Sequence, residues 1–357
     1  MYIAPRPRSA DDPNFPIRLG LTVVAGFLAM AWLQPTLAPI CVALPIGLIA
    51  GLRKAFDPAR AIGGAVAFAV VVWLMAGIVA ITRHVPAAML LVMFMFYFVG
   101  FYFTRRTGSA FGMLLLIAAS LMSIVGMKNP VMLNIFRDGF LLGCGVAAVT
   151  IPTLYLLVPA KTKEKHVDAP RAAAGHHGGG ALIRAVVLTG LCFWLYAVLP
   201  VSDMILAIAA VFPLIFPTQD EAFAEAAERS WATLIGGIVA LVVLALYGFS
   251  AHFEVLLVLM FTVGWGFGVA MMRGRMSASV YQFGLSVAAV LVATALTTSN
   301  PEVAMVQRVF LTLIGTLGAS IAVAVLDWLL LAPASHEDGY SPHPAIQRKK
   351  FNREYDI

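Results

Sequence analysis

Long apolar segments separated by short polar ones run along almost the whole chain. The segments lie at 17–33, 36–52, 60–82, 86–103, 109–126 and 131–158, and then at 182–199, 203–217, 230–249, 253–272, 277–297 and 302–332. A transmembrane helix needs about 20 mostly apolar residues, so segments of this length are expected to cross a bilayer as helices. The pattern therefore predicts an all-α polytopic membrane protein with about 12 transmembrane helices.

Short sequence motifs in the first half of the chain recur at matching positions in the second half. The recurring pairs are Ile17-Arg18 with Ile183-Arg184, Gly63-Gly64 with Gly236-Gly237, and Asn129-Pro130 with Asn300-Pro301. Because each half has an even number of spans, both halves are expected to have the same orientation in the membrane. We therefore predict two parallel six-helix repeats, related by a pseudo-twofold axis along the membrane normal.

The repeat divides the chain into five predicted parts. These are an N-terminal segment at 1–16, the first repeat at 17–159, a linker at 160–181, the second repeat at 182–333 and a basic tail at 334–357. The linker has no apolar periodicity and is expected to be flexible. The second span of each half is short and contains a proline, Pro45 or Pro213, which favours a broken or re-entrant helix.

The distribution of charged residues predicts how the chain is oriented in the membrane. Only 12% of the residues are charged, against about 25% in soluble domains, so we expect the lipid bilayer to surround the chain. The net charge of +6 does not indicate nucleic acid, because 20 of the 24 Lys and Arg fall in alternate short loops or the ends of the chain. Loops rich in Lys and Arg stay in the cytoplasm, so both termini are predicted to be cytoplasmic.

Arg137 and Arg308 are the strongest candidates for a functional role. Each follows an Asn-Pro pair that is suited to start a helix, which places the arginine about 10 Å inside the periplasmic end. A guanidinium at that depth is costly unless it faces protein or water, so the two arginines are expected to form a positive ring that binds anions. The alternatives are that each side chain extends to the lipid headgroups, or that an acid on a neighbouring helix neutralises Arg137.

Arg60 and Arg229 start the third span of each half, shortly before the glycine pairs. They are candidates for a second positive ring at the cytoplasmic mouth, although the orientation rule alone also explains them. The glycine pairs, together with Gly143, Gly145, Gly315 and Gly318 in the sixth spans, are expected to let helices approach closely.

Two acids are candidates for carrying a coupling proton. Asp138 follows Arg137 directly and points about 100° away on a helix, so we do not expect a face-on pair. A buried carboxylate at this depth can carry a proton, although a structural role with another polar group is the alternative. Asp203, near the periplasmic end, is the second candidate.

Other chemistry is not indicated by the sequence. Cys41, Cys144 and Cys192 lie in apolar segments without disulfide or metal spacing, and we predict no metal site. The chain contains no phosphate-binding glycine loop of the G-x-x-x-x-G-K-[ST] type and no combination of nucleophile and base. We therefore expect no cofactor and no enzymatic activity.

These residues resemble a known superfamily. An arginine shortly before Ile62-Gly63-Gly64 or Leu234-Ile235-Gly236-Gly237, and a last span running from Arg308 to Gly315, are similar to the fusaric acid resistance and aromatic acid exporter superfamily. The resemblance implies efflux of organic, often aromatic, carboxylates across a bacterial inner membrane, commonly with a periplasmic adaptor of the membrane-fusion type. Plant malate channels of the same superfamily imply that basic residues line an anion path. The larger exporters carry substantial cytoplasmic domains, whereas this chain resembles the compact, membrane-only members.

The sequence thus predicts a proton-driven inner-membrane exporter of small organic anions. Two alternatives use the same scaffold: a passive anion channel, and a membrane scaffold that assembles an adaptor complex without transporting anything. The sequence leaves open whether copies of the chain form a homo-oligomer.

Overall fold

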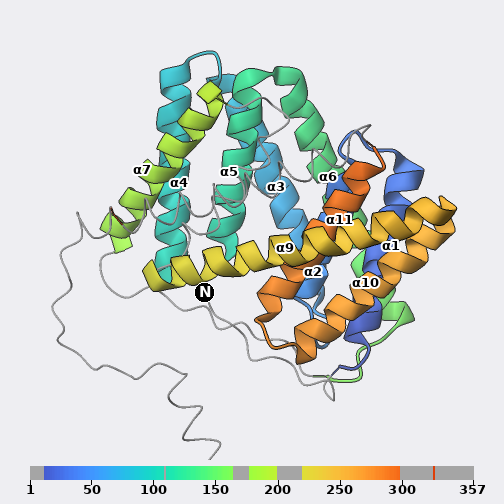
Figure 1. Cartoon of the computed structure of the whole chain (residues 1–357). Coiled ribbons are helices and arrows are strands. Elements are labelled where there is room, and N and C mark those ends of the chain that lie inside the picture. The colour runs from blue at the N-terminus through green and yellow to red at the C-terminus, as the bar shows by residue number, and fades with distance from the viewer. Residues whose placement is uncertain (1–11, 108–109, 164–176, 199–218, 298–324, 326–357) are drawn as a thin grey trace, which may run out of the picture.

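The computed structural model of the chain is an all-helical assembly (Figure 1). It describes residues 12–107, 110–163, 177–198, 219–297 and 325. Its helices are α1 (Phe15–Leu33), α2 (Ala38–Ala50), α3 (Pro58–Thr82), α4 (Pro86–Thr107), α5 (Ala110–Lys128), α6 (Pro130–Leu157), α7 (His177–Val198), α9 (Gln219–Ser250), α10 (Phe253–Arg273) and α11 (Ala278–Ala295). The described residues contain no strand, which confirms the prediction of an all-α fold.

Ten of the predicted spans coincide with these helices to within a few residues at most boundaries. Seven helical segments in the described part of the chain are long and apolar enough to cross a membrane. The protein is therefore a polytopic all-α membrane protein. The predicted spans at 203–217 and 302–332 lie almost wholly outside the described residues, so the total of about 12 helices stays a prediction.

The surface of the helical bundle is apolar enough to lie in a lipid bilayer. Large hydrophobic side chains stand exposed on several helices, among them Trp73 on α3, Met95 on α4, Ile238 on α9 and Val258 on α10. A water-soluble protein rarely exposes apolar surface on this scale. These faces are therefore suited to contact lipid.

Side-chain caps start two of the helices, and the cap of α6 is the one predicted from the sequence. Asn129 caps α6, because its side-chain oxygen accepts a hydrogen bond from the backbone N–H of Val131 at 2.9 Å, with Pro130 in the first turn. Asp57 caps α3 in the same way through the N–H of Ala59 at 3.2 Å. Both caps satisfy backbone donors that the helix itself leaves unpaired.

In the first half the second span is not a broken helix, so that form of the prediction is wrong, whereas a re-entrant helix stays a prediction. α2 runs without interruption from Ala38 to Ala50, with Pro45 inside it. A proline removes one backbone hydrogen bond and crowds the preceding turn, but α2 packs against α1, α6 and α11, which hold it in place. Pro213 lies outside the described residues.

Helices from the two predicted halves interleave around two apolar cores. One core is built from α3, α4, α5, α6 and α7. The other is built mainly from α1, α2, α9, α10 and α11. α7 lies along α4, and α1 lies along α10 (Figure 1). The first helix of each predicted half thus packs against the fourth helix of the other half.

Glycines make the contact between α1 and α10 unusually close. A Cβ atom placed on Gly264 of α10 would lie 2.8 Å from the Cα of Gly20 on α1, and one on Gly268 would lie 2.7 Å from the Cα of Pro16. These are backbone-to-backbone contacts that no side chain can enter. Gly266, between them in the sequence, has open space around its Cα instead.

The glycines singled out from the sequence divide into packed and open positions. Gly236 lies directly against the backbone of Gly284 on α11, and Gly143 packs on Ile40 of α2, as predicted. No atom of another described helix lies within 4 Å of a Cβ placed on Gly63 or Gly145, so the described helices do not pack closely on these two glycines. Gly315 and Gly318 lie outside the described residues.

The predicted orientation can be tested by chemical labelling. In a variant without the native cysteines, Lys128→Cys at the end of α5 is expected to react with a membrane-impermeant thiol reagent added outside intact cells. Ala173→Cys in the linker is expected to react only after the membrane is permeabilised, because Lys-rich loops stay in the cytoplasm. Labelling of the linker in intact cells would contradict the predicted orientation and indicate the opposite one.

Candidate functional site

Arg137 lies two turns into α6 and forms an ion pair with its neighbour. Its Nε donates a hydrogen bond to Oδ1 of Asp138 at 2.8 Å, and the two side chains are 32% and 62% exposed. The two residues are not on one face of the helix, as expected, and they pair because the long arginine side chain bends across the helix surface. Asp138 is therefore an exposed partner of Arg137, and its role in proton coupling stays a prediction.

The repeat-related partner of Arg137 and the second acid are not placed. Arg308 and Asp203 lie outside the described residues. The positive ring that Arg137 and Arg308 are predicted to form therefore stays a prediction.

Arg60 and Arg229 contact different kinds of neighbours. Arg60 Nε lies 3.8 Å from Oδ2 of Asp57, the residue that caps α3, and its side chain is 40% exposed. Such a surface pair contributes at most about 1 kcal/mol. The guanidinium of Arg229 on α9 stacks on the ring of Phe283 on α11. A second positive ring at these two residues stays a prediction.

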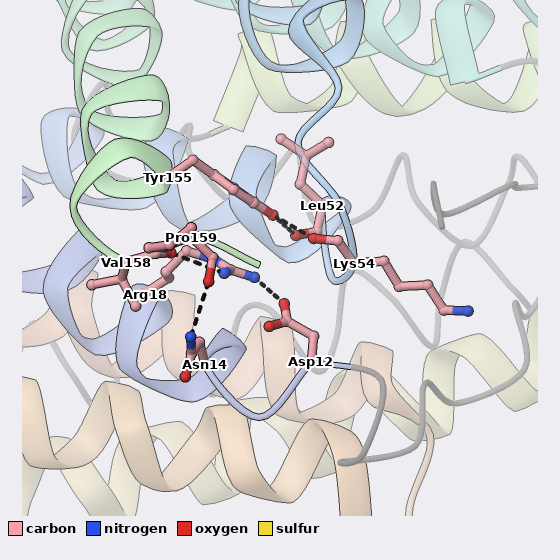
Figure 2. Close-up of polar contacts among 8 residues, drawn as sticks. All are labelled: Asp12, Asn14, Arg18, Leu52, Lys54, Tyr155, Val158 and Pro159. Carbon is pink, nitrogen blue, oxygen red and sulfur yellow. Dashed lines mark hydrogen bonds and ion pairs between the residues drawn. The ribbon is translucent and has the colours of Figure 1, made fainter. Parts of the chain in front are cut away.

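Two fully buried arginines of the described chain were not among the candidates selected from the sequence. Arg18, in the first turn of α1, is fully buried, and so is Asp12, with which it forms an ion pair through Nη2 and Oδ2 (Figure 2). Its Nη1 donates a hydrogen bond to the carbonyl of Val158, just past α6, at 3.1 Å. The pair therefore ties the start of α1 to the end of α6.

Tyr155 of α6 supports this arginine from one side. The Cζ atom of Arg18 lies 4.1 Å from the centroid of the Tyr155 ring, which is the geometry of a cation–π contact. The Tyr155 hydroxyl donates to the carbonyl of Leu52, and it also lies 3.3 Å from the carbonyl of Lys54 (Figure 2). The loop between α2 and α3 is thereby joined to the same cluster.

Asn14 completes the cluster on the side of the N-terminal turn. Its Nδ2 donates to the carbonyl of Pro159 at 2.9 Å (Figure 2). We call Asp12, Asn14, Arg18 and Tyr155 the α1–α6 cluster. Burial raises the pKa of the Asp12 carboxyl, and the Arg18 guanidinium and the backbone N–H of Asn14 together offset only part of this effect.

A second buried arginine occupies the corresponding place in the second half. Arg184 in α7 is fully buried and donates from Nη1 to the carbonyl of Gly180 at 3.1 Å. The guanidinium of Arg105, at the end of α4, packs directly on Gly180. The repeated pairs Ile17-Arg18 and Ile183-Arg184 are the sequence signal for this position, although the orientation rule counts both arginines among the 20 Lys and Arg of the cytoplasmic loops and chain ends.

A small polar cluster lies in the core formed by α4, α5 and α7. The hydroxyl of Tyr97 lies 3.1 Å from Oγ of Ser123 and 3.5 Å from Sγ of Cys192, and all three side chains are buried. These groups are uncharged and satisfy one another. We assign them to packing.

The fold and its arginines define a multi-pass membrane protein with cations inside its helical bundle. Residues 191–323 match the family described as fusaric acid resistance protein-like, which confirms the resemblance predicted from the sequence. No curated protein and no solved structure matches the chain. The matched region begins in α7 and includes α9, α10 and α11, and together with the apolar helices it indicates a transporter-like membrane protein.

Proposed function

We propose that this protein exports small organic carboxylates, chiefly aromatic ones, across the bacterial inner membrane. The observation that carries the proposal is the match of residues 191–323 to the fusaric acid resistance protein-like family on a bundle of membrane-spanning helices. A carboxylate crossing such a bundle needs cations along its path, because an unpaired charge in an apolar interior is costly.

The packing of the described helices supports the proposed architecture of two parallel six-helix repeats. A twofold axis that exchanges the halves turns the contact of α1 with α10 into the contact of α7 with α4, and both contacts are present. It also relates the contact of α3 with α5 to that of α9 with α11. In this arrangement both termini lie in the cytoplasm and the anion path runs between the halves.

Arg137 and Arg308 are proposed to bind the anion near the periplasmic end, and Arg60 and Arg229 near the cytoplasmic mouth. The position of Arg137 two turns into α6 supports the first assignment, since Asp138 leaves part of its guanidinium available to another acceptor. A periplasmic membrane-fusion adaptor is proposed as a partner on the strength of the family resemblance. The proposal involves no catalysis and no cofactor.

The proton gradient is the proposed energy source, with Asp138 as the first proton carrier and Asp203 as the second. Uncouplers are expected to stop export in cells, whereas depletion of ATP at a maintained proton gradient is not. Asp138→Asn is expected to leave the fold intact and to remove the pH dependence of transport, because the amide cannot exchange a proton. Unchanged pH dependence in this variant would transfer the assignment to Asp203.

A thermal-shift screen of the purified chain tests the substrate class. A ligand that binds only the folded protein adds about 2.7 kcal/mol of stability at 100 times its dissociation constant. Aromatic carboxylates are expected to raise the melting temperature, and the matching primary amides are not. A shift produced equally by acid and amide would contradict recognition of the carboxylate.

A further inference from the structure

The ion pair at the start of α1 joins a fixed cation to a carboxylate on a short connection. Arg18 belongs to α1, and its guanidinium is held by the carbonyl of Val158 and the ring of Tyr155 at the end of α6. Asp12 precedes the helix, in a turn closed by a hydrogen bond from Phe15 N–H to the Asp12 carbonyl at 3.2 Å. Asp12 can therefore leave Arg18 by a rearrangement of this turn, without movement of either helix.

The pairing of these two charges leaves polar atoms of both residues unsatisfied. Oδ1 of Asp12 and Nε of Arg18 are buried and have no hydrogen-bond partner among the described residues. A guanidinium binds a carboxylate most strongly through two parallel hydrogen bonds, which this arrangement does not form. Burial raises the pKa of the Asp12 carboxyl even beside Arg18, which shows that the site disfavours the charged form of this side chain. With Oδ1 and Nε both unpaired, Arg18 holds Asp12 less firmly than it would hold a carboxylate bound through two parallel hydrogen bonds.

We propose that Arg18, backed by Tyr155, is a binding site for the carboxylate of the transported anion, and that Asp12 is the internal occupant that this anion displaces. The inference rests on the proposed function and names a site beyond the predicted arginine rings. A free carboxylate can align with Nε and Nη2 together, which satisfies the atom that Asp12 leaves unpaired. The displaced Asp12 side chain then gains the water that it lacks when buried.

The position of the site suits the loading step of an exporter. Arg18 lies at the end of α1 that the loop charges place in the cytoplasm, next to the N-terminal segment. An anion bound there is at the side of the membrane from which it is to be exported. Asp12 keeps the buried guanidinium neutralised while no anion is bound.

The test measures benzoate binding to the full-length protein purified in detergent. Asp12→Asn removes the competing charge and keeps the size of the side chain. If Asp12 occupies the site nine-tenths of the time, its loss tightens the apparent affinity about tenfold, since the site is then always available. Glu254→Gln, which removes one acid from an exposed position in the first turn of α10, is the matched control and is expected to bind benzoate like the wild type.

A second substitution tests whether the tighter benzoate binding of Asp12→Asn depends on Arg18. The double variant Asp12→Asn, Arg18→Gln is expected to lose the tighter binding. An affinity in Asp12→Asn equal to that in Glu254→Gln, or a gain that survives in the double variant, would overturn the proposal and leave the ion pair a structural one. If the wild type transports benzoate while these variants bind it alike, only this inference fails. If no variant binds benzoate and no flux is seen, the proposed function fails with it.

A labelling experiment keeps the ion pair of Asp12 and Arg18 in place and so needs no substitution of either charge. Asn14→Cys, in a chain without the native cysteines, reports on the turn that carries Asp12. Benzoate is expected to accelerate its reaction with a thiol reagent, because displacement of Asp12 breaks the ion pair that still holds this turn to Arg18. A rate that benzoate leaves unchanged would contradict displacement.

Discussion

Replacing both Arg137 and Arg308 with glutamine is expected to nearly abolish anion transport, and replacing either one is expected to weaken it. Under the proposed twofold axis the two residues lie at one depth, and two guanidiniums converging on the path attract a carboxylate strongly in partly desolvated surroundings. Their mutual repulsion when the site is empty also favours the anion-bound state. The measurement is the initial rate of benzoate uptake into proteoliposomes at matched protein content.

Lysine at the same two positions separates this role from lipid contact. Lysine returns the charge but not the planar guanidinium, so only partial rescue of transport is expected. If the arginines merely extend to the headgroups, lysine serves as well as arginine and glutamine has little effect. A double glutamine variant that inserts normally and transports at the wild-type rate would exclude the anion ring.

A leucine at Gly264 is expected to separate α1 from α10 and to cause the largest loss of stability of any substitution considered. The new Cβ would lie 2.8 Å from the Cα of Gly20, which belongs to the backbone of a packed helix and cannot move aside as a side chain can. Overpacking commonly costs about 1–3 kcal/mol when side chains can move, and a contact between two backbones leaves less room to adjust. The expected result is a melting temperature far below that of the wild type, or a protein that does not purify as a monodisperse species.

Gly266 provides the control within the same helix. It is exposed and has no atom near its missing side chain, so Gly266→Leu adds an apolar group to a lipid-facing surface. This variant is expected to melt at or slightly above the wild-type temperature, because leucine favours helix more than glycine does. Equal losses from Gly264→Leu and Gly266→Leu would show that α1 and α10 do not pack through their glycines.

The helices could be predicted from the sequence because the bilayer fixes their length and composition. The third span was predicted at 60–82 and the helix runs from Pro58 to Thr82, with Asp57 as its cap. The start of α6 at Asn129-Pro130 could be predicted for a second reason, because cap residues act on the backbone next to them. Such features depend on neighbours in the sequence alone.

The burial of Arg18 depends on residues that the sequence does not place beside it. Tyr155 and Val158 lie more than a hundred positions away along the chain, at the end of α6. From sequence, an arginine next to a helix start resembles an orienting charge of a cytoplasmic loop. Its recurrence as Arg184 was the only local sign of another role.

The same limit applies to the glycines. Gly63 and Gly236 occupy equivalent places in the two halves, yet within the described part of the chain only Gly236 meets another backbone, that of Gly284. A small residue permits a close approach, but a helix must be present on that face to make one. Which face is covered is a property of the tertiary arrangement.

Carboxylate flux through the purified chain in proteoliposomes tests the central claim most directly. Vesicles containing only this protein, loaded with benzoate and given an imposed pH gradient, are expected to move benzoate faster than protein-free vesicles, and an uncoupler is expected to remove the dependence on the gradient. Flux that ignores the pH gradient would identify a passive anion channel instead. An orientation-independent absence of flux for aromatic and aliphatic carboxylates, in vesicles that contain folded protein, would contradict the transport function and favour a scaffold that assembles an adaptor complex.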